Sequence, residues 1–361
     1  MRVNVSIGMV ALLAAFAPGA SPCPPPSPSV PLVTETRPAL GSLASVSIAG
    51  AEPALASAAT EAVFAVLERV GFSMNEWRAD SPLSALNDAA GGDWVALPAD
   101  LCDALARAGE GAVRTGGRFD PTWAALSDLW RFDGAHPTPP SDAEVRARCP
   151  LVDHRGLQLR PLPGGACEGR LARRGMRVGL GGLAKGWALD AAASAVRALG
   201  VRDFLLQAGG DLYAAGRPAG APWPVAVRDP RGGPLDVLAT VPVSDRAFST
   251  SGDYEHAYVA GGRRYHHVID PRTCIPATAS QSVSVLARSA VDAEILDKAL
   301  FVAGGEQALA LARASGVEAI VVDSGGRVLA TSGLRAFLPG AEARAPAARH
   351  GDGDAPRVRE P

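Results

Sequence analysis

The chain has 361 residues, of which 47% are hydrophobic and 20% are charged, and its formal net charge is −2. This length suits one large domain or two small ones, and the apolar fraction is sufficient for a sizeable core. A net charge so close to zero argues against a nucleic-acid-binding protein, because such proteins usually present a basic face.

Residues 1–22 have the pattern of a secretory signal peptide or leader. Arg2 precedes an apolar run over 10–17 that ends in Ala-Phe-Ala, an A-x-A cleavage pattern. Cys23 suggests a lipid anchor, but the proline before it fits a lipobox badly. The proline-rich stretch 23–36 predicts an exposed linker. These features predict an exported protein of the periplasm or the outer face of the cytoplasmic membrane, with any membrane association made through the N-terminus.

The main domain is predicted over 37–340, and 341–361 predicts a disordered tail because it lacks periodicity. Alternation predicts a first strand at 43–49, and helical apolar stripes predict helices at 52–70 and 98–117. Short apolar runs between turn residues predict further strands at 203–207, 223–227, 235–243, 265–269 and 283–287, followed by helices near 291–302 and 305–315 and strands at 318–323 and 328–331. The predicted fold class is α+β, a mixed and mostly antiparallel sheet with packed helices.

The five cysteines are too few for a disulfide scaffold, and no Cys/His spacing indicates zinc. Cys149 and Cys167 flank a predicted strand and turn. In an oxidising compartment they would be able to pair, and two unpaired buried thiols are the alternative.

The stretch "GLGGLAKGWALD" (179–190) is a glycine-rich turn that leads into a helix. Such a turn offers backbone N–H groups to an anion. It is not a P-loop, because alanine rather than glycine precedes Lys185. Gly179, Gly181 and Ala184 match a dinucleotide fingerprint, but no acidic residue ends the next strand. A nicotinamide-dependent oxidoreductase is therefore one alternative.

Six motifs in order resemble those of the FAD:protein FMN transferase (ApbE) family. The glycine-rich turn and "LLQAGGDLYAAG" together form one motif, similar to the family's D-x-G-G-x-A-K-G turn followed by G-G-D-x; the other five motifs are "LGSLASVSI", "MNEWRADSPLSALN", "GRFDPTWAALSDLW", "FSTSGDYE" and "RYHHVIDPRTCIP". The resemblance covers almost all of 38–335. It implies a T-fold-type domain that moves FMN from FAD, with magnesium, onto a Thr or Ser hydroxyl of a client protein and releases AMP. A family member that binds FAD with weak or no transfer is the alternative.

The resemblance also implies a set of FAD-binding residues. Lys185 would pair with the diphosphate, Trp77 stands where the family has Tyr and would stack on a ring, and Leu40 replaces Met as an apolar wall. The remaining members are Arg118, Phe119, Asp120, Gly179, His267 and Ile269. Three of these residues have a structural alternative. Lys185 would be a solvated side chain, Trp77 a core or rim residue, and Asp120 a cap for a helix that begins near Thr122.

Two adjacent histidines follow on a predicted strand, so their side chains point to opposite faces. The family pattern H-x-I-D-P selects His267 as the general base for the client hydroxyl, a role that suits an imidazole. His266 is then expected to face solvent or a neighbouring strand.

The chain departs from the family pattern at three places. Gly179 replaces an Asp, Cys274 replaces a Gly, and the metal motif A-D-x-x-x-T-A becomes Ala-Glu294-x-x-x-Lys298-Ala. With the carbonyl of Gly182, Glu294 and Lys298 occupy the implied magnesium positions, but a protonated lysine has no lone pair to give. We therefore expect either weakened magnesium binding or an ammonium in the metal's place, paired with Glu294 at i, i+4. A competing alignment places Asp292 in the metal role.

Overall fold

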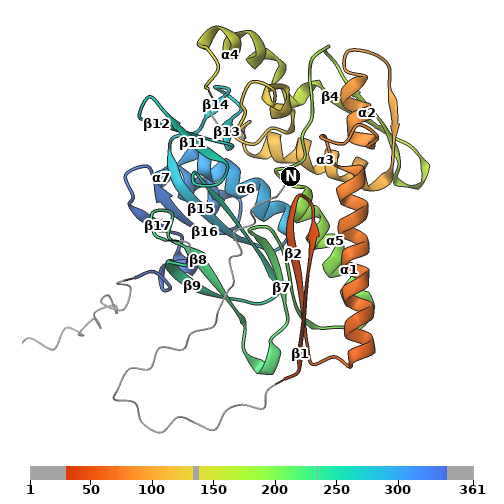
Figure 1. Cartoon of the computed structure of the whole chain (residues 1–361), viewed down its shortest axis with the longest axis vertical. Coiled ribbons are helices and arrows are strands. Elements are labelled where there is room, and N and C mark those ends of the chain that lie inside the picture. Colours follow the sequence, from red (N-terminus) through yellow and green to blue (C-terminus); the bar gives the residue numbers. More distant parts are fainter. Residues whose placement is uncertain (1–29, 133–137, 234, 340–361) are drawn as a thin grey trace, which may run out of the picture.

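A computed structural model describes residues 30–132, 138–233 and 235–339. The main feature of this fold is an antiparallel sheet of eight strands (Figure 1). Every neighbouring pair in this sheet runs antiparallel. In spatial order the strands are β1 (Leu32–Ala39), β2 (Ser42–Ala49), β6 (Asp203–Ala208), β7 (Asp211–Ala215), β10 (Arg246–Gly252), β15 (Ser280–Ala287), β16 (Glu318–Asp323) and β17 (Val328–Ala330). The predicted α+β class, with its mostly antiparallel sheet, is confirmed.

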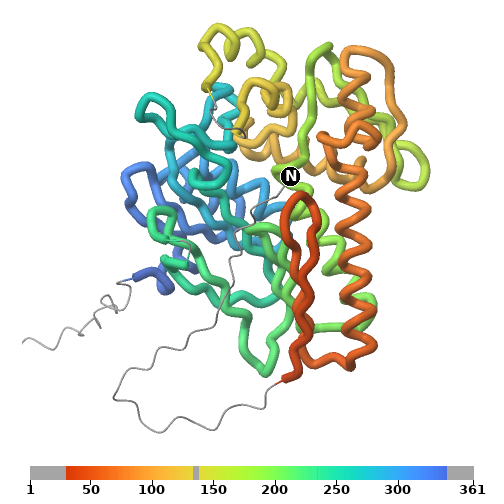
Figure 2. The backbone as a smooth tube through the Cα atoms, viewed as in Figure 1, coloured from red at the N-terminus to blue at the C-terminus, as the bar shows by residue number. Residues whose placement is uncertain are grey.

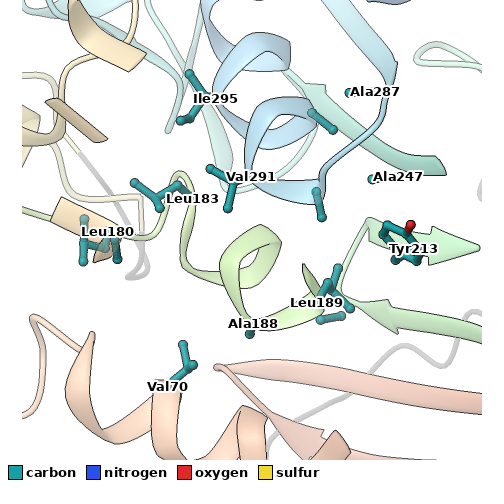
Figure 3. Packing of buried hydrophobic residues seen from close by; sticks show 14 of the residues in the cluster. Val70, Leu180, Leu183, Ala188, Leu189, Tyr213, Ala247, Ala287, Val291 and Ile295 are labelled. Atoms are coloured by element: carbon teal, nitrogen blue, oxygen red, sulfur yellow. The ribbon is translucent and has the colours of Figure 1, made fainter. Parts of the chain in front are cut away.

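Helices cover one face of the sheet and a hairpin covers the other. Along β7, Tyr213 packs into the helix-side core, whereas Leu212 and Ala214 pack under the hairpin, as strand alternation requires. The helices are α1 (Pro53–Ser73), α5 (Ala184–Ala198), α6 (Ala290–Ala303) and α7 (Gly305–Ala314), and the hairpin pairs β8 (Trp223–Arg228) with β9 (Val237–Val243). Figure 3 shows α5 between the other two long helices, with Ala188 toward Val70 of α1 and Leu183 toward Val291 of α6.

A smaller lobe gathers above the long sheet in the view of Figure 2. Its sheet joins β3 (Val95–Leu97), β5 (Cys167–Leu171) and β4 (Leu157–Pro161), and its helices are α2 (Pro82–Asp88), α3 (Ala99–Arg114) and α4 (Asp142–Arg148). Two short hairpins, β11 (Ala257–Ala260) with β12 (Arg263–His266) and β13 (Ile269–Asp270) with β14 (Ile275–Pro276), lie nearby, and α8 (Ser332–Arg335) ends the described chain. Within the described ranges, no helix is long and apolar enough to cross a membrane.

Several sequence predictions need correction. The linker predicted over 23–36 is wrong in its last part, because β1 begins at Leu32 and pairs along its whole length with β2. The strand predicted at 265–269 is interrupted after His266. The signal peptide, Cys23 and the tail lie outside the described residues. The dinucleotide-binding alternative fails on topology, because β5 and β6, which flank the glycine-rich turn, belong to different sheets rather than to one parallel pair.

Two disulfides join elements that are distant in sequence, Cys102 with Cys167 and Cys149 with Cys274. Both interpretations of Cys149 and Cys167, as a pair or as free thiols, are therefore wrong. The first bond ties α3 to β5, across 65 residues of chain. The second fastens the loop before β14 to the segment after α4, across 125 residues. Each such bond typically contributes about 2–4 kcal/mol to stability.

The crossing of α5 and α6 depends on glycine at one position. A Cβ on Gly186 would lie 2.4 Å from the carbonyl oxygen of Ala290. We expect Gly186→Ala to lower the free energy of unfolding by about 1–3 kcal/mol, because backbone rather than a flexible side chain must move. Gly109→Ala on α3 is the matched control: it meets nothing within 4 Å and should stabilise by up to about 1 kcal/mol. Urea unfolding of both variants tests this, and equal effects would contradict it.

Candidate active site

A buried charge cluster joins α5, α6 and the sheet. The Glu294 side chain is fully buried, and its Oε2 accepts the backbone N–H of Gly186 at 2.7 Å. Its Oε1 lies 2.8 Å from the Lys185 ammonium, which also lies 2.9 Å from Oδ2 of Asp211 on β7. The two carboxylates outweigh burial and raise the pKa of Lys185, so this lysine stays charged. It is therefore not a solvated side chain, and two of its three N–H donors are taken by carboxylates.

A second lysine extends the cluster by one helical turn. The Lys298 ammonium lies 2.9 Å from Oδ1 of Asp297 and 3.0 Å from the carbonyl oxygen of Glu294. The expected i, i+4 pair is secondary, because the Glu294 carboxylate is 3.9 Å away and bonds to Lys185 instead. The Ser249 hydroxyl lies between the remaining oxygens of Asp297 and Asp211, and its one proton is donated to one of them at a time.

Burial raises the pKa of Asp297 and of Glu294, against the neighbouring ammonium groups. For Asp211 the balance reverses: burial raises its pKa, but Lys185 and Lys298 outweigh burial and hold that pKa below its ordinary value. Asp211 is therefore the carboxylate of the cluster that is held most firmly in its charged form.

The glycine-rich turn packs directly on this cluster. A Cβ on Gly182 would lie 3.3 Å from Cδ of Lys298 and 3.2 Å from Cε2 of Phe119. Gly209, which follows β6, lies close to Lys185 in the same way. A Cβ on Gly209 would lie 3.6 Å from Cε of Lys185. The structure thus brings together Phe119, Gly182, Lys185, Glu294 and Lys298, five of the predicted site residues.

The two histidines take the opposite faces expected of them. His267 is half-buried and its Nδ1 lies 3.0 Å from the carbonyl oxygen of Glu255. Burial, with smaller contributions from His256 and Lys298, lowers the pKa of His267 to about 4. His266 does not face solvent: it is buried, its Nε2 lies 2.8 Å from the carbonyl oxygen of Ala277, and its ring meets the edge of Phe301.

The turn is not an open anion cradle. The Glu76 carboxylate faces the backbone N–H groups of Leu180 and Gly181, and these groups oppose the burial that raises its pKa. A Cβ on Gly179 would lie 2.7 Å from Oε1 of Glu76. The carboxylate that is missing at Gly179 is therefore matched by one at Glu76, which lies in the motif at 74–87 at a position to which the family pattern assigns no residue.

Other predicted FAD-binding residues have structural partners or lie at a rim. Trp77 is 72% exposed and does not belong to the core. Asp120 caps the 3₁₀ helix Pro121–Leu126 through Thr122, and its Oδ2 lies 2.9 Å from Nδ1 of His154, so the capping alternative is observed. Leu40 forms the β1–β2 turn with a φ of 51°. Ile269 packs in a separate apolar cluster with Trp130 and Cys274.

Arg118 has one unpaired donor. Its Nη1 donates to the carbonyl oxygen of Thr115 at 3.2 Å, while its Nε is buried without a partner among the described residues. Asp292, the competing metal residue, pairs with Arg114 at 2.5 Å on the outside of α6 and stays apart from the cluster. Cys274 has a φ of 61°, in the region that favours the glycine of the family pattern, and the bond to Cys149 holds it there.

This fold is shared with flavin transferases of known structure. A solved ApbE protein of Thermotoga maritima superimposes with a TM-score of 0.78 at 28% identity, covering 85% of this chain and 99% of that one. The flavin transferase ApbE of Vibrio cholerae gives a TM-score of 0.75 at 26% identity, covering 86% and 100%.

The sequence places the chain within the same group. The ApbE family model matches residues 40–321, and a FAD:protein FMN transferase of Treponema pallidum is 36% identical over 312 residues, covering 82% of this chain and 85% of that protein. A second, of Rhodobacter capsulatus, is 32% identical over 320 residues, covering 88% of this chain and 60% of that protein. The chain belongs to the ApbE family.

The lowered pKa of His267 is directly measurable. The folded state keeps this imidazole neutral down to about pH 4, whereas the ordinary value is 6.5. The stability that this group contributes is therefore complete above about pH 6.5 and is lost as the pH falls through the window between the two values. Imidazole-detected NMR, assigned with His267→Gln, should show a midpoint well below that of a peptide histidine. A midpoint near 6.5 would contradict the burial argument.

Proposed function

We propose that this chain is a FAD:protein FMN transferase. The observation that carries the proposal is the meeting of the glycine-rich turn, a two-lysine charge cluster and a neutral histidine in a domain whose family and fold match flavin transferases. The substrate is FAD, and the second substrate is a client protein that presents a Thr or Ser hydroxyl.

The reaction is a group transfer at the diphosphate. The client hydroxyl oxygen attacks the phosphorus of the FMN half, the bond from that phosphorus to the bridging oxygen breaks, and AMP leaves with the bridging oxygen. His267 takes the hydroxyl proton, which requires an imidazole that is neutral before the reaction; its pKa of about 4 provides this state but also makes it a weaker base than an ordinary imidazole. The developing negative charge on the phosphate oxygens needs cations that are already in position.

FAD would lie along the rim formed by the residues that the family pattern selects. Trp77 offers an exposed indole for stacking, and Leu40 offers an apolar contact at the β1–β2 turn. Arg118 offers the buried, unpartnered Nε beside Phe119. Gly179, Asp120 and Ile269 shape the backbone around this rim, since their own contacts are internal.

The magnesium that the family implies does not fit the donor set present here. The single Ser249 hydroxyl proton serves either Asp211 or Asp297, and the other carboxylate oxygens of Asp211, Glu294 and Asp297 meet Lys185, Gly186 or Lys298. No group of three or more acidic, His or Cys side chains in the described part of the chain is arranged to hold a metal. Magnesium prefers near-octahedral oxygen ligands, and an ammonium lies where one of them would be.

We further propose that the protein acts outside the cytoplasm. The leader-like residues 1–22 suggest export, and two disulfides, Cys102–Cys167 and Cys149–Cys274, suit an oxidising compartment. Fractionation of cells that express the full chain, with N-terminal sequencing of the mature protein, tests this. A reduced, unprocessed protein in the cytoplasm would contradict it.

His267→Ala should slow FMN transfer by about 10²–10⁴-fold, because it removes the proton acceptor and no charge. The purified protein is incubated with FAD and exported proteins of the source cell. In-gel flavin fluorescence and mass spectrometry then detect FMN added to Thr or Ser, and AMP is quantified separately. Asp292→Asn is the matched control on the outer face of α6. Undiminished transfer by His267→Ala would contradict the assigned role.

A further inference from the structure

We propose that the Lys298 ammonium is a built-in cation for the diphosphate of FAD, so that this chain binds FAD without a divalent metal. The inference rests on the proposed function, because it concerns how the same site holds its substrate. It starts from the disagreement between the family's magnesium and the donor set of this chain.

The distribution of lysine in the chain is the first observation. Of its 35 lysine and arginine residues only two are lysines, Lys185 and Lys298, and both lie in the charge cluster. Arginine serves at every other basic position, including all the surface pairs. A guanidinium is broad and planar, whereas an ammonium is a compact point charge of a size closer to a metal ion. The two sites that keep lysine are therefore those where a compact cation is needed.

The position of the ammonium is fixed by its surroundings. The aliphatic stem of Lys298 passes over Gly182, where a Cβ would meet Cδ at 3.3 Å and Cε at 3.4 Å. At its end, two of the three N–H donors have acceptors, Asp297 and the carbonyl oxygen of Glu294. The third has no hydrogen-bond acceptor among the described residues, and the side chain is 21% exposed. One directed donor thus remains for a phosphate oxygen.

The same contacts disfavour a metal. For magnesium to use the Glu294 carboxylate, it must compete with Lys185 at 2.8 Å from Oε1 or with the Gly186 N–H at 2.7 Å from Oε2, and it must lie beside the Lys298 ammonium, 3.9 Å from Oε1. Weaker pairing of the buried charges and repulsion between like charges both disfavour this. A phosphate oxygen gains from the same arrangement, because a charge-assisted hydrogen bond forms without any rearrangement.

The test measures FAD affinity, by quenching of flavin fluorescence in the full-length protein, with EDTA and with added MgCl₂. We expect the dissociation constants measured with EDTA and with MgCl₂ to agree within about twofold. Loss of a charge-assisted contact would instead weaken FAD binding by tenfold or more, and each factor of ten corresponds to about 1.4 kcal/mol. Binding that EDTA weakens by tenfold or more and MgCl₂ restores would overturn the inference and leave the transferase proposal intact. No binding under either condition would overturn both.

A threonine at this position should reverse the behaviour. Lys298→Thr removes the ammonium from Asp297 and Glu294, so we expect its FAD affinity to fall by tenfold or more in EDTA and to recover with MgCl₂. Asp292→Asn on the same helix should behave as the wild type. Circular dichroism and the melting temperature establish whether the variant is folded. A folded Lys298→Thr protein with unchanged, EDTA-insensitive affinity would overturn the inference.

A second measurement is made on the wild-type protein, and a variant is used only to assign the signals. Selective ¹³C labelling of lysine in the wild type gives signals from only two residues, which Lys298→Arg assigns. We expect FAD alone to shift the Lys298 signal and MgCl₂ alone to leave both signals unchanged. A saturable shift with MgCl₂ alone would show a metal site at the cluster and would overturn the inference.

Discussion

The site depends on one buried carboxylate, that of Glu294, which joins helix α6 to the first turn of helix α5. Glu294 projects from α6, accepts the N–H of Gly186 in the first turn of α5, and pairs with Lys185 beside it. Lys185 continues the connection to Asp211 on β7. A buried charge is tolerated only when its partners are in place, and breaking such a pair typically costs about 3–5 kcal/mol. The relative position of α5, α6 and the sheet is thereby set by electrostatics as well as by packing.

This arrangement positions the groups that we propose act on the substrate. Because Lys298 lies one turn after Glu294, its ammonium is placed by the same helix at the glycine-rich turn, against Gly182. Its charge also helps to keep His267 neutral, although burial is the larger cause. The proposed cation and the proposed base are thus coupled, because the Lys298 ammonium also disfavours a protonated His267 imidazole.

Local patterns in the sequence predicted most of the fold and part of this site. Alternation and helical stripes identified the helix faces and the antiparallel strands, and the order of motifs brought Lys185, Glu294 and Lys298 into one site. The partners that complete it, Glu76, Asp297 and Ser249, lie inside the motif stretches at positions to which the family pattern assigns no residue. Their role arises from contacts between elements, some of them far apart in the chain; Lys185 and Glu294 alone are 109 residues apart. Likewise, the pairing of Cys149 with Cys274 rather than Cys167 depends on tertiary distance, which spacing does not contain.

The three departures from the family pattern bear on whether the chain is active, because each is met by a contact elsewhere. The space where an Asp at 179 would begin holds the Glu76 carboxylate. The ammonium of Lys298 is balanced by Asp297, one residue earlier on the same helix. Cys274, at a φ that favours glycine, is held by its bond to Cys149. A site that had simply decayed would leave buried charges unpaired at such places, and unpaired buried charge is costly. At these three places the contacts instead keep the buried charges paired and the strained turn fixed.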